Sequence, residues 1–160
     1  MQDDMSVPTP ALEWVMTLDV TIGEPQPLGE AIDGRRANYP IIGGYFVGPG
    51  LQGDVLPGGA DFYCLRPDGV GDLDATYSLR TDRGELINVH NRGFLVLSEE
   101  GHRREGEGAW PLPEHLYHCT CSPRFQVARG ALGWLTEAAF IGRVTYPGED
   151  RVVIRVYRLD

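Results

Sequence analysis

Hydrophobic and polar residues alternate along most of this chain, in short runs separated by glycine and proline. In the clearest run, residues 12–20, the apolar positions are Leu12, Trp14, Met16, Leu18 and Val20. A period of two over such a run predicts a β-strand with one buried and one solvated face. Further strands are expected at 41–47, 51–56, 61–65, 73–81, 85–89, 94–98, 117–127, 140–146 and 151–159. Short strands at this spacing predict an all-β fold, and closure into a small antiparallel β-barrel would remove exposed strand edges.

The segments between these strands divide the rest of the chain. Glycine, proline and aspartate mark the turns, and Thr81–Gly84 predicts a hairpin. Residues 23–38 are expected to form a long loop or cap, and 99–114 a mobile excursion of the kind that often covers a ligand entrance. Pro123 requires a bulge or a strand edge. One short helix of two to three turns is expected near the C-terminus, at residues 131–140. Residues 1–10 are interpreted as a disordered leader, and 11–160 as a single domain.

Composition narrows the possible functions. The net charge is −9, and all 14 basic residues other than histidine are arginine. Such a charge disfavours nucleic acid and anionic membranes as partners. The absence of lysine excludes Schiff-base chemistry and a P-loop. There is no basic start followed by an apolar run and no stretch of 18 apolar residues, so we expect a cytoplasmic protein. Three cysteines, an odd number, do not form a disulfide framework.

Several of these segments resemble the DUF3237 family, also called UPF0311. The resemblance is carried by the runs GGYFVGPGLQGDVLPGGADF (43–62) and LDATYSLRTDRGELINVHNRG (73–93), by SPRF (122–125) and by the final VVIRVY. It covers the chain beyond the leader, although Phe62 and Thr136 depart from the usual tryptophan and asparagine. The resemblance implies a single-domain β-barrel with no classical cofactor. It also implies a place in aromatic-compound or secondary metabolism, where isomerase or cyclase roles have been proposed.

Side-chain alternation predicts which polar groups point into the barrel. Tyr77 is the polar member of an inward row on 73–79, Asn91 belongs to the matching row across the hairpin, and Asp61 begins the row of the strand before them. A carboxylate in an apolar barrel is a candidate general base, with Tyr77 and Asn91 as hydrogen-bond donors to a carbonyl or enolate. These three are the predicted catalytic residues. The alternatives are that Asp61 caps a turn, Asn91 ends a strand and Tyr77 is a core aromatic.

Other residues are candidates for substrate binding. A buried arginine clamps a carboxylate or phenolate bidentately, and Arg36, Arg92 and Arg124 all lie in or beside the family-like motifs. Ion pairing with acidic residues on neighbouring strands is the competing interpretation, and Arg92 is expected on the face opposite Asn91. The aromatic candidates are Tyr63, Tyr117 and Trp134, the last as a plug at one barrel end or as a pocket floor.

Residues 115–121 raise a metal hypothesis. His115, Tyr117, Cys119 and Cys121 share one face of a strand, but no Cys-x-x-Cys pair or second cluster completes a tetrahedral site. A Cys/His nucleophile pair also lacks a supporting signature, and free cysteines are commonly buried apolar residues.

The sequence therefore favours a cofactor-independent isomerase or cyclase that acts on an aromatic or polyketide-like small molecule by acid–base catalysis. A non-catalytic binding or carrier protein and a metal-assisted hydrolase using residues 115–121 are the alternatives. No bound metal or cofactor is expected, and a homodimer is possible.

Overall fold

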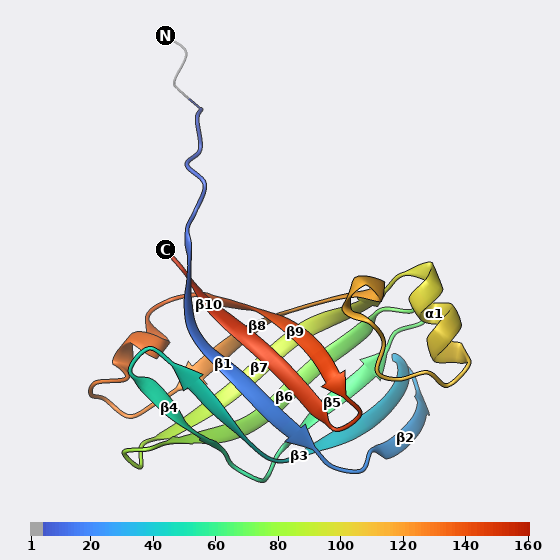
Figure 1. Cartoon of the computed structure of the whole chain (residues 1–160), viewed down its shortest axis with the longest axis horizontal. Helices are drawn as coiled ribbons and strands as arrows, with labels where there is room; N and C mark the ends of the chain where they lie inside the picture. Colours follow the sequence, from blue (N-terminus) through green and yellow to red (C-terminus); the bar gives the residue numbers. More distant parts are fainter. Residues whose placement is uncertain (1–4) are drawn as a thin grey trace.

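A computed structural model describes residues 5–160, and most of them form one antiparallel sheet (Figure 1). The strands are β1 (Leu12–Ile22), β2 (Gln26–Ala31), β3 (Gly34–Gly48), β4 (Leu51–Val55), β5 (Ala60–Leu65), β6 (Gly71–Thr81), β7 (Leu86–Leu97), β8 (Tyr117–Gln126), β9 (Phe140–Gly148) and β10 (Arg151–Leu159). Residues 5–10 of the expected leader carry no helix or strand, and residues 1–4 lie outside the described part.

The sheet closes on itself because β1 pairs with both β3 and β10. From β3 onward each strand pairs with the next around the wall, with one exception. β4 and β5 share a single position in the wall, because each of them pairs with β3 on one side and β6 on the other. β2 lies in line with β1 along β3. The result is an eight-stranded up-and-down barrel, which confirms the predicted fold class. No helix within residues 5–160 has the length and apolarity needed to cross a membrane.

The two ends of the barrel differ in how their interior is filled. At the end that holds β4 and residues 133–136 (Figure 1), inward side chains such as Phe46, Leu79, Ile87 and Leu135 are at most 2% exposed and pack into a continuous core. At the other end, which holds β2, β5 and residues 99–106, the strands surround a cavity. Alternation along β6 and β7 follows the prediction, with Ala75 opposite Asn91 and Tyr77 opposite Val89.

The prediction of a helix at residues 131–140 is wrong. That segment forms only a 3₁₀ turn, η2 (Gly133–Thr136), since Gly130 and Gly133 disfavour a longer helix. The α-helix of the described chain is α1 (Glu99–Gly106), inside the segment expected to be a mobile loop. Ser98 caps it by accepting a hydrogen bond from the Gly101 N–H, and acidic residues in its first turn and basic ones in its last suit the helix dipole. A second 3₁₀ turn, η1 (Glu114–Leu116), leads into β8.

Residues 23–38 were also expected to be a loop, and most of them are strand. β2 carries Pro27 and Gly29, which an edge strand tolerates because its outer backbone groups need no partner. A two-residue turn at Ile32 and Asp33 joins it to β3. β7 (Leu86–Leu97) is one strand, where two were expected at 85–89 and 94–98. Pro123 lies in β8 beyond its last pairing with β9, at an edge as predicted.

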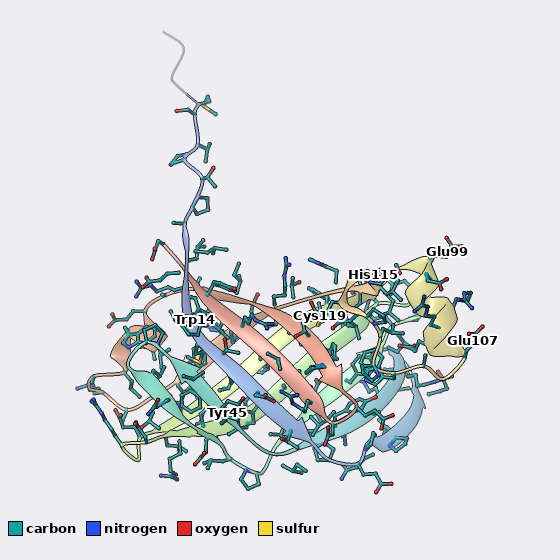
Figure 2. All side chains as sticks on the ribbon, viewed as in Figure 1. Trp14, Tyr45, Glu99, Glu107, His115 and Cys119 are labelled. Atoms are coloured by element: carbon teal, nitrogen blue, oxygen red, sulfur yellow. The ribbon has the colours of Figure 1, made fainter. Side chains whose placement is uncertain are left out.

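A register shift in β1 changes which of its side chains face inward. The shift falls between Trp14 and Met16, so that Val15 and Met16 are both buried. Leu12 and Trp14, predicted to face the core, are 51% and 41% exposed. Figure 2 shows Trp14 near the start of β1 on the outside of the barrel.

Candidate functional site

A cavity of about 640 Å³ occupies the barrel end that is framed by β2, β3, β5, α1 and the β9–β10 turn. Its volume lies within the range of roughly 300–1,000 Å³ that holds drug-sized ligands. Most of its wall is aliphatic or aromatic. The aliphatic residues include Val20, Ile41, Leu65, Leu73, Val144 and Ile154.

One row of residues carries polar groups across the wall. Tyr39 on β3 pairs with Asp61 on β5, Asp61 with Ala75 on β6, and Ala75 with Asn91 on β7. All four line the cavity. Because the methyl group of Ala75 is small, it leaves space between the carboxylate of Asp61 and the amide of Asn91.

Asp61 is the carboxylate of this row and is partly buried. The Asp74 backbone N–H donates to its Oδ1 at 2.8 Å, which leaves Oδ2 for a ligand. Burial raises the pKa of Asp61 to about 6; the hydrogen bond from Asp74 opposes this rise, and the charge of Asp74 adds to it. Near neutral pH the group therefore exchanges protons readily, as a general acid or base must.

Three tyrosine hydroxyls border the cavity without a hydrogen-bond partner among residues 5–160: those of Tyr39, Tyr63 and Tyr77. Tyr77 is 5% exposed, and burial raises the pKa of all three phenols. They consequently stay protonated at physiological pH and can donate hydrogen bonds.

Asn91 is 6% exposed, and its Oδ1 is the buried side-chain atom without a partner in the described chain. Its amide hydrogen-bonds Cys121 and so lowers the pKa of that thiol, although burial dominates and raises it to about 11. The N–H donor predicted for a substrate carbonyl is therefore turned toward a cysteine.

Tyr146 on β9 is a further polar residue at the cavity and was not predicted from the sequence. Tyr146 lines the cavity, and its hydroxyl lies 3.5 Å from Cys119 Sγ. Its ring packs against that of Trp110 with centroids 5.1 Å apart. Alternation with Val144 could have identified Tyr146. Tyr39 was missed because it lies between the loop expected at 23–38 and the strand expected at 41–47, whereas β3 already begins at Gly34. Nothing local marked Trp110.

Of the other predicted binding residues, some line the cavity and others point away from it. Arg36 lines the cavity mouth, where Asp33 holds it in a bidentate ion pair. Tyr63 lines the interior. Arg92 and Arg124 point outward from β7 and β8.

Two predicted aromatic residues lie off the cavity wall. Tyr117 is outside the lining and accepts a hydrogen bond from the Tyr146 N–H at 2.9 Å, where β8 and β9 no longer pair. Trp134 sits on η2 at the opposite barrel end, with the Arg158 guanidinium 6.0 Å from its ring. It belongs to the plug rather than to a pocket floor.

Residues 115–121 do not assemble a metal centre. His115 and His118 are exposed, His115 on η1 before β8 (Figure 2), whereas Cys119 and Cys121 face the interior. Within residues 5–160 no three His, Cys, Asp or Glu side chains gather as metal ligands would. Burial raises the pKa of Cys119 to about 12, so this thiol is not an activated nucleophile either.

Comparison with known proteins gives consistent matches over the whole barrel. The model of the family described as "Protein of unknown function (DUF3237)" matches residues 10–159. A UPF0311 protein of Rhodopseudomonas palustris is 37% identical over 94% of this chain and 99% of its own length. A crystal structure of a conserved protein of unknown function from the same species has a TM-score of 0.87 at 34% identity, covering 96% of this chain and 100% of that one. An enzyme from Penicillium herquei shares the fold, with a TM-score of 0.71 at 21% identity over 97% of this chain and 98% of that one.

Proposed function

This chain belongs to the DUF3237 family, and we propose that it is a cofactor-independent acid–base enzyme that isomerises or cyclises an aromatic or polyketide-like carbonyl compound. One observation carries the proposal: Asp61, a carboxyl with a pKa of about 6, lies in a mostly apolar cavity that protonated tyrosines also line. The fold also occurs in a protein described as an enzyme, which is an analogy of architecture only.

Asp61 transfers the protons in the proposed reaction, and Tyr77 stabilises the enolate. Oδ2 of ionised Asp61 removes a proton from the carbon next to the substrate carbonyl, and the C–H electron pair moves into the enolate. Tyr77, which remains protonated, donates a hydrogen bond to the enolate oxygen. Asp61 then returns the proton to another carbon in an isomerisation. In a cyclisation the enolate carbon attacks a second carbonyl carbon, and the new alkoxide takes that proton.

The shape of the cavity supports this chemistry. A rigid barrel wall holds a ligand ring in one orientation, and proximity of this kind lowers activation barriers substantially. Neither reaction consumes an oxidant, a reductant or a second substrate, so the protein's own side chains supply every proton transfer.

The exchange of the acidic α-hydrogens of 2-tetralone, an aromatic ketone, for deuterium tests the proposal. We expect the wild-type protein in D₂O to accelerate loss of the α-proton NMR signals, Asp61→Asn to abolish the acceleration, and Tyr77→Phe to lower it roughly 10²-fold. Asp54→Asn, an exposed carboxyl outside the cavity, is the matched control and should exchange at the wild-type rate.

A carrier protein without turnover is the second candidate, because a mostly apolar cavity of this size is also what a carrier needs. Calorimetric titration with the same ketone separates the two. Binding without any acceleration of exchange would refute catalysis and favour the carrier, and undiminished exchange in Asp61→Asn would refute the role of Asp61.

A further inference from the structure

Aromatic rings surround the mouth half of the cavity on two sides. Tyr39 and Tyr63 meet edge to face with centroids 5.8 Å apart, and Trp110 and Tyr146 form a second pair at 5.1 Å. All four line the cavity. Rings arranged around a space present electron-rich faces and attract positively charged nitrogen, as aromatic cages for ammonium groups do.

The charges that face this space are negative. Asp61 comes from β5, Glu105 from α1 at the mouth, and Glu149 from the β9–β10 turn, and all three line the cavity. None of the three is ion-paired within residues 5–160. Asp61 and Glu105 both act on Tyr39 and Tyr63, since each carboxylate raises the pKa of both phenols. The first aromatic pair therefore lies near two carboxylates that have no ion-pair partner within residues 5–160, and Tyr39 is the cross-strand neighbour of Asp61.

The two arginines at the mouth do not reverse this field. Arg35 pairs with Glu30 at 2.9 Å, and Arg36 pairs with Asp33 at 2.5 Å. Each guanidinium is thus neutralised by a partner of its own, and the whole chain carries a net charge of −9. An anionic ligand would meet three carboxylates, whereas a cation would satisfy them.

We propose that the cavity binds an organic cation, whose positively charged nitrogen lies against the Tyr39–Tyr63 pair, near Asp61 and Glu105, and whose apolar body fills the barrel interior. The proposal goes beyond the acid–base function and holds with or without turnover. It sets the charge of the ligand, which the acid–base chemistry leaves open.

Three naphthalene probes of similar shape and different charge test the proposal: 1-naphthylmethylammonium, 1-naphthylmethanol and 1-naphthoate. Isothermal titration calorimetry of the full chain at pH 8 gives each dissociation constant. We expect the ammonium probe to bind about tenfold more tightly than the alcohol, and the naphthoate to bind more weakly than either. Asp61→Asn and Glu105→Gln should each remove several-fold of the advantage in affinity that the ammonium probe has over the alcohol.

Glu99→Gln is the matched control, because Glu99 lies on the same helix but outside the cavity lining. It should keep the full advantage. Equal affinity for ammonium and alcohol, tightest binding of naphthoate, no binding of any probe, or an advantage that survives in the Asp61→Asn/Glu105→Gln double variant would each overturn the proposal. The probe titrations measure affinity and the 2-tetralone experiment measures catalysis. A failure of the cation proposal would therefore not contradict the acid–base function, and an absence of exchange would not change the ranking of the probes.

Discussion

Replacing Asp61 by asparagine should make this protein more stable above pH 6 and change its stability much less near pH 4. The folded protein holds the pKa of Asp61 at about 6, against 3.8 for the ordinary group, chiefly because burial penalises the charged form. An acid whose pKa is raised on folding binds more protons in the folded state. Its stabilising contribution is complete below pH 4 and is lost as the pH rises through 6.

The size of the effect follows from this difference in pKa. About two units correspond to roughly 3 kcal/mol of unfolding free energy lost between pH 4 and pH 7.5. Asparagine has nearly the same shape and keeps an oxygen for the Asp74 N–H, but it never ionises. The stability difference between Asp61→Asn and wild type should therefore grow by up to about 3 kcal/mol over this range, or roughly 6–12 °C in Tm for a chain of this size.

Urea denaturation at half-unit steps from pH 4 to pH 8 measures the difference directly. Asp54→Asn, at an exposed position outside the cavity, should show no such trend. A difference between Asp61→Asn and wild type that stays constant from pH 4.5 to pH 7.5 would refute the buried-carboxyl account of Asp61, and with it the basis for general-base catalysis.

Three further outcomes are expected. Gly59→Ala should lower the free energy of unfolding, measured in urea, by several kcal/mol, since Gly59 has φ +75° and a Cβ there would strike the Thr76 carbonyl oxygen. Gly84→Ala, at φ +88° but in open space, should lower it by only about 1 kcal/mol. Arg151→Met should destabilise by about 1–3 kcal/mol at pH 7, because it leaves the 8%-exposed Asp19 carboxylate without its ion pair. That loss should shrink at the lowest pH the fold tolerates, since Arg151 holds the pKa of Asp19 below its usual value and protonation removes the unpaired charge; an equal loss at both pH values would contradict the assignment. The three buried cysteine thiols should resist Ellman's reagent at pH 8 in the folded protein and all react in guanidinium, and fast labelling of the native protein would show that the barrel opens.

The sequence alone was sufficient for the barrel and for the inner face of several strands. Period-two patterns along β6 and β7 correctly predicted that Tyr77 and Asn91 face inward, because a strand's side-chain direction is a local property. The same reasoning failed at Trp14, where a register shift that no local pattern marks turns the side chain outward. It also missed α1, although Ser98 and the charges of that helix are a recognisable capping signal.

Only the tertiary structure decided which of the inward groups share one cavity. Asp61, Tyr39 and Asn91 lie on one row because β3, β5, β6 and β7 pair in a particular register, and Tyr146 arrives from a strand distant in sequence. The exclusion of Trp134 and the inclusion of Glu105 depend on which end of the barrel each connecting segment covers. The sequence therefore determined the wall and the candidate base, because alternation is set within a strand. Barrel closure determined the ligand site, because pairing register and burial depend on contacts between strands far apart in the chain.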